Sequence, residues 1–222
     1  MNQLLQHCDG TRDHKGQYIN EMLHRYLQKR EEAFGKDSPD LADVAWLKAH
    51  GMELIDGFYV MAYTGSSSSW LNAEKRNGQD YKSVCKAAFA KGLENALIKV
   101  EPFHGQVYRM EECDDEGIQA DWFSKNIGIT FHIPYYLSTA TDDYDNTPMV
   151  WVIQTLPEGK GREIAGISNA PGENEVLFSR GSKFVITGAD LSNPDKVFIY
   201  LDEVPADAET DLDLCGVYYR NF

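Results

Sequence analysis

Apolar residues recur every three or four positions in the first hundred residues, and this spacing predicts amphipathic helices. In the clearest case, Ile19, Leu23 and Leu27 would share one helix face, and Gly35 would end the helix. The predicted segments are a helix over 16–36, a short helix from Ser38-Pro39-Asp40 to before Gly51, an apolar stretch over 54–63, a helical or loop segment over 70–77, and a helix over 81–100. The polar residues 64–69, which include four serines, predict a break in this series.

After Pro102 the pattern changes to short β-prone runs that Gly and Pro interrupt every eight to twelve residues. The predicted strands are 106–110, 128–131, 149–156, 163–167, 175–178, 183–187, 197–201 and 216–219. Helices therefore occupy the first part of the chain and strands the remainder. Because the two kinds of element are segregated rather than alternating, the pattern predicts an α+β fold.

The charge balance excludes several classes of partner. The chain carries 21 Lys and Arg against 35 Asp and Glu, which gives a net charge of −14. This charge repels phosphate backbones and anionic lipids, and no basic patch in the sequence offsets it, so we expect no nucleic-acid partner. No apolar run approaches the roughly 18 residues of a membrane helix, so we expect no membrane partner. Scattered histidines predict no metal site, and GxGxxG, P-loop and GxSxG motifs are missing.

The cysteines are too scattered for a metal-binding or redox motif. They are Cys8, Cys85, Cys113 and Cys215. Without any CxxC pair, the spacing predicts free thiols in a reducing compartment. Residues 1–16 are polar and contain two aspartates, unlike a Sec signal peptide, which has a basic start and an apolar middle.

Three short pieces of the strand-rich part carry side chains suited to chemistry. Arg109 stands in an apolar strand, as either an edge charge in solvent or a rigid clamp for phosphate. Ser138 and Thr139 either end a strand in a hydroxyl-rich turn or hold a neighbouring charged group. Glu173 and Glu175 are either a solvated acidic loop or a functional pair. On an extended chain the two carboxylates would share one face and repel each other.

The order and spacing of these pieces are more specific than any one of them. Ser138-Thr139 follows Arg109 by 29 residues, and Glu173-x-Glu175 follows by a further 35. The set resembles the Arg / Ser-Thr-Ser / Glu-x-Glu signature of mono-ADP-ribosyltransferases of the clostridial binary-toxin and vertebrate ecto-enzyme type. Many relatives in this family are bacterial toxins or effectors. The resemblance covers residues 56–188.

The flanking residues extend this resemblance. The stretches 160–164 and 175–178, with Ser168, Gly181 and Phe184, are similar to the family's residues around its catalytic glutamate. Upstream, residues 62–65 and Asn72 resemble the segment on which the toxins bind NAD.

The chain also departs from the family pattern in three places. Ala140 replaces the usual third serine, and Met110 follows the arginine where many relatives have Gly or Arg. The aromatic residue that stacks on nicotinamide has two candidates, Tyr144 and Trp151, and neither matches cleanly.

The resemblance implies the ADP-ribosyltransferase fold. In this α+β fold, helices of the N-terminal part pack on two roughly perpendicular, mainly antiparallel sheets. We expect one domain over residues 1–222, with a helical N-terminal part at 1–55 and an NAD-binding catalytic core at 56–222.

The resemblance also implies the reaction. The family cleaves the bond between nicotinamide and ribose in NAD, which is a substrate, and transfers ADP-ribose to a target. A fixed carboxylate stabilises the positive charge of the oxocarbenium-like transition state. By resemblance Glu175 is this carboxylate, Ser138 holds it, and Arg109 binds the NAD phosphates. The predicted catalytic residues are Glu175, Glu173, Ser138 and Arg109, and the predicted NAD contacts are Arg109, Met110, Asn72, Tyr63, Ser138, Thr139 and Glu175.

Glu173 bears on the acceptor. An arginine side chain has a pKa above about 12 and is a poor nucleophile until a carboxylate orients it and accepts a proton. In the family, Glu at this position accompanies arginine acceptors, whereas Gln accompanies other acceptors. We therefore expect an arginine-directed enzyme, with the loop over 166–172 touching the target protein.

Two alternatives differ from this interpretation. The chain would be a toxic NAD glycohydrolase if it hydrolysed NAD without transfer, or a non-enzymatic α+β binding module if the three pieces were surface residues. The expected partners are a target protein that presents an arginine and a cognate immunity protein. We expect a toxin or effector secreted without a Sec signal that acts in the target-cell cytosol, or a cytoplasmic protein if a phage encodes it.

Overall fold

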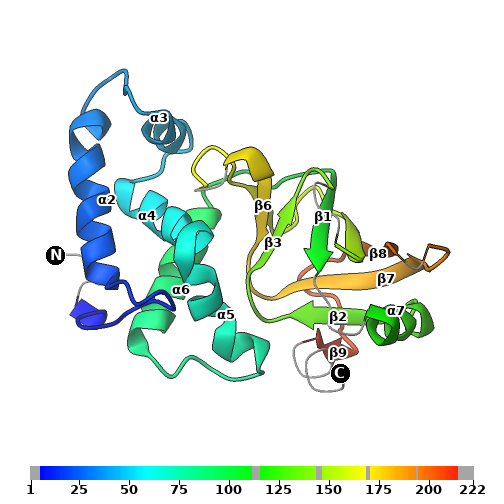
Figure 1. The fold of residues 1–222 in the computed structure, drawn as a ribbon. Coiled ribbons are helices and arrows are strands. Elements are labelled where there is room, and N and C mark those ends of the chain that lie inside the picture. Colours follow the sequence, from blue (N-terminus) through cyan, green and yellow to red (C-terminus); the bar gives the residue numbers. More distant parts are fainter. Residues whose placement is uncertain (1–5, 112–115, 144–146, 169–170, 194, 215–222) are drawn as a thin grey trace. The chain divides into compact units, whose positions relative to one another are not determined.

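The chain divides into two compact units in a computed structural model (Figure 1). The structure describes residues 6–111, 116–143, 147–168, 171–193 and 195–214. The helical unit comprises Met1–Lys75, Gln79–Glu101 and Ile164–Gly172. The sheet unit comprises Arg76–Gly78, Pro102–Glu163 and Glu173–Phe222. The expectation of a single domain over residues 1–222 stays a prediction.

The helices of the first unit follow the predicted segments closely. They are α2 (Ile19–Phe34), α3 (Ala42–Ala49), α4 (Leu54–Ala62), the π-helix η1 (Tyr63–Ser67), α5 (Ser68–Arg76) and α6 (Val84–Leu97). Helix α4 packs against both α2 and α6. Its close approach to α6 depends on Gly92, where a Cβ atom would clash with the ring of Tyr59. None of the helices in the described part of the chain is long and apolar enough to cross a membrane.

The predicted polar break at residues 64–69 is wrong. The chain stays helical there, because η1 follows α4 directly and α5 follows η1. The hydroxyl of Ser66 donates to the carboxylate of Asp13 at 2.6 Å, so the serine finds a partner 53 residues away. A long-range hydrogen bond thus overrides the local preference of serine for turns.

A disulfide joins Cys8 to Cys85 inside the helical unit. Both cysteines are fully buried, and their Cα atoms lie 4.8 Å apart across 77 residues of sequence. The prediction of free thiols is therefore wrong for this pair, whereas Cys113 and Cys215 lie outside the described residues. Spacing alone could not reveal the pair, because it does not show which distant cysteines meet.

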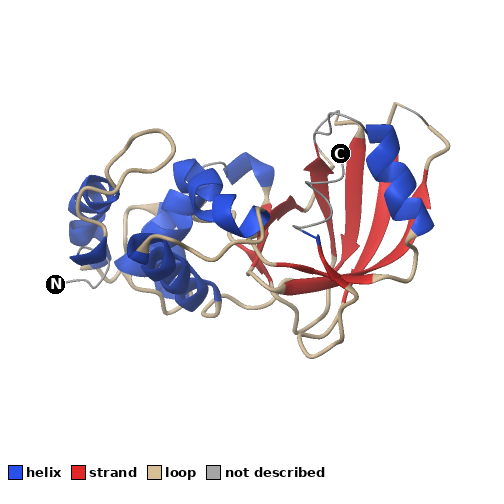
Figure 2. Ribbon diagram, turned by 90° about the horizontal axis from the view of Figure 1, so that it is seen from below, coloured by secondary structure: helices blue, strands red, loops and turns tan. Residues whose placement is uncertain are grey.

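The strands of the second unit form one continuous sheet in the order β5-β6-β3-β1-β4-β8-β7-β2-β9 among the described residues. The strands are β1 (Gln106–Glu111), β2 (Thr130–Ile133), β3 (Leu137–Ala140), β4 (Met149–Gln154), β5 (Gly161–Glu163), β6 (Glu175–Phe178), β7 (Ser182–Asp190), β8 (Val197–Glu203) and β9 (Leu212–Asp213). Only the β4–β8 and β2–β9 pairs of these strands are parallel, so the sheet is mainly antiparallel, as expected. Hydrogen bonding joins all these strands into one curled ladder (Figure 2).

The core of the sheet unit lies between the curled sheet and α7 (Glu116–Lys125), a helix that the hydrophobic pattern did not predict. Helix α7 packs against β7 and β8. Its Phe123 meets Trp151 of β4 edge-to-face, with ring centroids 5.5 Å apart. The α+β prediction is confirmed, and β6 has the predicted bounds. The predicted strand at 163–167 instead ends at Glu163, and the one at 216–219 lies outside the described residues.

Candidate active site

Strand order brings together the arginine, hydroxyl and glutamate pieces that are distant in sequence. Strands β1, β3 and β6 are neighbours in the sheet. Arg109 lies in β1, Ser138 and Thr139 lie in β3, and Glu175 is the first residue of β6. The sheet therefore joins the predicted clamp, the predicted positioning hydroxyl and the predicted catalytic carboxylate on three adjacent strands.

Glu175 is a buried carboxylate held by a hydroxyl. Its side chain accepts a hydrogen bond from Ser138 Oγ at 2.7 Å, and the residue is only 4% exposed. In the β3–β6 register Ala140 lies opposite Glu175, and Ser138 shares the face of Ala140 because it is two residues away. The register of two strands thus positions the carboxylate, as the sequence predicted for this pair.

Arg109 is fixed on two sides. Its Nε donates to the carboxylate of Glu111 at 2.8 Å, and one terminal nitrogen donates to the backbone carbonyl of Ser138 at 3.0 Å. The Arg109 side chain is 21% exposed and that of Glu111 is 10% exposed. Because such an ion pair is largely shielded from water, it holds the guanidinium more firmly than a surface pair would.

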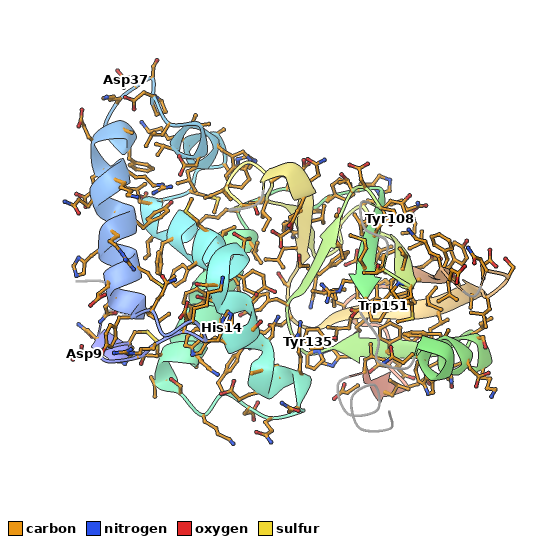
Figure 3. The ribbon with its side chains drawn as sticks, viewed as in Figure 1. Asp9, His14, Asp37, Tyr108, Tyr135 and Trp151 are labelled. Atoms are coloured by element: carbon orange, nitrogen blue, oxygen red, sulfur yellow. A yellow bond between two sulfur atoms is a disulfide. The ribbon has the colours of Figure 1, made fainter. Side chains whose placement is uncertain are left out.

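Sequence reasoning missed two residues near these strands. Glu111 could have been found, because residues two apart on a strand share a face and a carboxylate at that distance can pair with an arginine. Arg76 gave no such signal. Its guanidinium lies 5.2 Å from the ring centroid of Tyr135, just before β3 (Figure 3), and its buried Nε has no hydrogen-bond partner among the described residues.

Thr139 and Met110 occupy structural positions next to the motif. The hydroxyl of Thr139 donates to the backbone carbonyl of Val176 at 2.7 Å, so it ties β3 to β6. Met110 is half-buried in β1, opposite Val150 of β4. Their contacts with NAD stay predictions.

Glu173 and Glu175 lie in different environments, although two residues separate them. Glu173 ends the short 3-10 helix η2 (Pro171–Glu173) and is exposed, so the expectation of an extended chain with both carboxylates on one face is wrong. Asn174 between them has a φ of 45°, a left-handed conformation that Asn adopts more readily than most residues. Its side chain donates to Asp142 at 3.1 Å, and its carbonyl accepts from the backbone of Thr141.

Tyr63 and Asn72, the predicted NAD contacts upstream, meet each other within the helical unit. Asn72 Nδ2 donates to the hydroxyl of Tyr63 at 3.1 Å, and both residues are almost fully buried. This hydrogen bond links η1 to α5 and fixes the orientation of both side chains.

Trp151 is not the residue that stacks on nicotinamide. It is fully buried in the core of the sheet unit (Figure 3), where Phe123 and Phe131 pack against it. A ring with no exposed surface cannot receive a substrate ring. The other candidate, Tyr144, lies outside the described residues.

A family profile described as ADP-ribosyltransferase exoenzyme matches residues 59–205, which include every predicted site residue. The chain belongs to the ADP-ribosyltransferase exoenzyme family. Among curated protein sequences, none matches this chain. The match confirms the resemblance drawn from the Arg, Ser-Thr and Glu-x-Glu pieces.

Solved structures of bacterial ADP-ribosyltransferases share the fold of this exoenzyme. Plx2a, a toxin from Paenibacillus larvae, is 16% identical with a TM-score of 0.63, over 82% of this chain and 96% of its own. HopU1 of Pseudomonas syringae is 18% identical with a TM-score of 0.59, over 86% and 91%. C3stau2 from S. aureus, solved with NAD, is 14% identical with a TM-score of 0.56, over 82% and 94%. The predicted ADP-ribosyltransferase fold is therefore confirmed.

Family membership establishes the general chemistry of this exoenzyme, the mono-ADP-ribosylation of a target with NAD as the substrate. The residues present fit that substrate. A guanidinium suits a pyrophosphate, and a fixed carboxylate suits ribose hydroxyls and a developing positive charge. Among the described residues, no group of three His, Cys, Asp or Glu side chains is arranged to hold a metal ion.

Proposed function

We propose that this exoenzyme transfers ADP-ribose from NAD to an arginine side chain of a target protein and releases nicotinamide. The observation that carries the proposal is the contrast between two neighbouring glutamates. Glu175 is buried and held by Ser138, whereas Glu173 is exposed two residues earlier. One carboxylate suits the NAD ribose, and the other is accessible to an acceptor.

In this proposal each motif residue acts on a different part of NAD. Arg109, held by Glu111 and the carbonyl of Ser138, binds the phosphates. The bond between nicotinamide and the ribose carbon breaks, and its electron pair leaves with nicotinamide. The negative charge of Glu175 stabilises the oxocarbenium-like transition state, because a preoriented carboxylate needs no reorganisation as positive charge develops. Tyr63, Asn72, Met110 and Thr139 supply further NAD contacts.

Glu173 serves the acceptor. Its carboxylate orients the target guanidinium and accepts a proton as a guanidine nitrogen forms the new bond to the ribose carbon. Water requires no such help to attack the same carbon. This difference separates an arginine transferase from an NAD glycohydrolase, because only transfer depends on Glu173.

The decisive experiment compares Glu173→Gln with the wild type in two assays. The first assay measures labelling of agmatine, a small arginine mimic, and the second measures nicotinamide release without an acceptor. We expect agmatine labelling to fall by about a hundredfold, with hydrolysis within a few-fold of wild type. Glu158→Gln is the matched control, because Glu158 is an exposed glutamate of the same unit, and it should alter neither rate.

Four outcomes would contradict the proposal. Full retention of agmatine labelling in Glu173→Gln would mean that Glu173 does not serve the acceptor, and the arginine assignment inferred from the Glu-x-Glu pattern would lose its basis. Equal loss of labelling and hydrolysis would mean that Glu173 acts on NAD itself. If the wild-type enzyme hydrolysed NAD but did not label agmatine, the NAD glycohydrolase alternative would be favoured. If the wild-type enzyme released no nicotinamide, a non-enzymatic module would be favoured.

We further propose that the protein is a toxin or effector that acts in the cytosol of a target cell. The structures that share its fold include toxins and type III effectors. The Cys8–Cys85 disulfide supports export, because disulfides persist in oxidising compartments. Incubation with labelled NAD and a lysate, followed by mass spectrometry of the modified band, would identify the target. A cognate immunity protein is a further expected partner.

A further inference from the structure

A cavity of about 560 Å³ opens in the helical unit between α2, the loop before it and the junction of α4 with η1. We call it the basic cavity because Lys15, Arg25, Lys29 and Arg30 line it. Lys15 follows His14 in the loop before α2 (Figure 3). Ala62 and Gly65 of the segment 62–65 line the cavity, whereas the predicted NAD contacts of this unit, Tyr63 and Asn72, do not.

One face of α2 forms a wall of the basic cavity. Met22, Arg25, Tyr26, Lys29 and Arg30 line it and recur at steps of three and four residues, so they share that face. Arg25 and Lys29 are four residues apart, where two like charges on a helix repel each other. An anion bound between them would remove this repulsion.

Three cations of the basic cavity have no carboxylate partner among the described residues, namely Lys15, Arg25 and Lys29. The fourth, Arg30, is satisfied within the unit, because its Nε pairs with Asp43 at 2.5 Å and its guanidinium lies over the ring of Tyr26. All three unpaired cations are exposed. The cavity therefore has a surplus of positive charge on a protein whose net charge is −14.

Asp13 is the carboxylate nearest to the loop cation in sequence, and its oxygens are already engaged. They accept from the hydroxyl of Ser66 at 2.6 Å and from the backbone N–H groups of Lys15 and Gln17 at 2.9 and 2.8 Å. These contacts also occupy the loop's backbone donors at Lys15 and Gln17. A compact phosphate would find fewer backbone N–H groups here than phosphate sites normally offer.

The rest of the lining is apolar and adaptable. Phe58 and Ala62 are buried, and Met22 and Met61 are half-buried. Methionine side chains are flexible and polarizable, so they adjust to varied apolar groups. Burial raises the pKa of the Tyr26 hydroxyl, so this side chain adds no negative charge to the cavity. The basic cavity thus combines an apolar lining with a cationic rim, which suits an acidic segment that also carries apolar side chains.

We propose that the basic cavity binds an acidic, partly apolar peptide segment of the protein that the enzyme modifies. The identity of this partner rests on the proposed function, whereas binding of an acidic peptide does not. A nucleic acid or an anionic membrane would meet the negative charge of the whole surface, but a short segment meets only the local cations. The cavity would then recruit the target through residues that take no part in the chemistry.

A peptide-binding experiment tests the site without knowledge of the target. The probe is a short fluorescent peptide of Glu-Glu-Leu repeats, and its binding is followed by fluorescence anisotropy. We expect wild type to bind it and R25E/K29E to bind it about tenfold more weakly or worse, because each substitution replaces attraction with repulsion. K82E/K91E makes the same charge change at exposed lysines outside the cavity and should bind like wild type. A Gln-Gln-Leu peptide should not bind.

An enzymatic experiment tests the link to the target. R25E/K29E should label agmatine at the wild-type rate but label protein in a lysate more slowly than K82E/K91E does. Failure of wild type to label agmatine would remove the proposed function and leave the peptide result standing. Unchanged peptide binding in R25E/K29E, or lost peptide binding with unchanged protein labelling, would overturn the proposed role of the cavity. If R25E/K29E melts below the control, Lys15→Glu on the loop replaces it with the same expectations.

Discussion

The motif strands of the sheet unit and the basic cavity of the helical unit differ in how their charged residues are paired. In the sheet unit, Arg109 is paired with a largely buried Glu111, and Ser138 holds Glu175. In the helical unit, the exposed cations of the basic cavity have no such partners among the described residues. Fixed charges suit a reaction because they need no reorganisation, whereas unpaired exposed charges suit attraction of a second molecule. If both proposals hold, chemistry and target recognition lie in separate sets of residues and can be disrupted separately.

The largest expected effect comes from a substitution of Glu175, the carboxylate that Ser138 holds in place. Glu175→Gln keeps the size of the side chain but removes the charge that, in the proposed mechanism, faces the transition state. We expect agmatine labelling and NAD hydrolysis to fall together by about a hundredfold or more, as when one electrostatic stabiliser is removed from an active site. Incorporation of label into agmatine measures transfer, and nicotinamide release without an acceptor measures hydrolysis. Survival of either activity near the wild-type rate would refute the catalytic assignment.

The Cys8–Cys85 disulfide lies in the helical unit, so its removal should change the stability of the fold without changing a residue of the proposed active site. A bond that closes a loop of 77 residues should stabilise the fold by about 2–4 kcal/mol, because it restricts the unfolded chain. We expect a reductant to lower the melting temperature of the wild type by several degrees but to leave C8S/C85S unaffected. C113S/C215S is the matched control and should respond like wild type. A wild type that melts identically with and without reductant would argue against the bond.

A smaller effect is expected at Arg109. Lysine keeps the positive charge but lacks the planar fork that bonds to Glu111 and the Ser138 carbonyl and, in the proposal, to a phosphate as well. Arg109→Lys should weaken NAD binding by about tenfold, measured by calorimetry, with the circular dichroism spectrum unchanged. Peptide binding at the basic cavity should stay at the wild-type level, because that cavity lies within the helical unit. Unchanged NAD affinity would favour Arg109 as a charge without a role in phosphate binding.

The sequence predicted those parts of the molecule that local pattern determines. Strand β6 was predicted with its observed bounds, because the apolar run 176–178 comes shortly after a Pro-Gly pair. The Ser138–Glu175 pair was predicted by resemblance to a family signature, and the register of β3 with β6 provides its geometry. Helix α2 was also predicted, since its apolar residues recur with helical spacing.

The parts that were missed depend on contacts between distant residues. Residues 64–69 stay helical where Ser66 bonds to Asp13, which is 53 residues away in sequence. The disulfide depends on two cysteines that only the fold brings together. Glu173 was expected to share a face with Glu175, but a left-handed Asn174 turns the chain between them. These features arise from tertiary structure, which overrides local preference and is not encoded in spacing.

The π-helix η1 makes the helical unit tolerant of a change in chain length at one point. Residues nine positions apart on a regular α-helix lie about half a turn out of phase, since each residue turns the helix by about 100°. Tyr63 and Asn72 are nine apart and yet share a hydrogen bond, so the wider turn of η1 brings them closer in phase. A single π-turn holds one residue more than a regular turn, so removing one residue from η1, such as the exposed Gly65, would close the turn to a regular one and leave α5 nearly in place. Removing one residue from the regular helix α5 before Asn72 would instead rotate Asn72 away from Tyr63 by about 100°, so we expect the junction to tolerate a deletion in η1 better than one in α5.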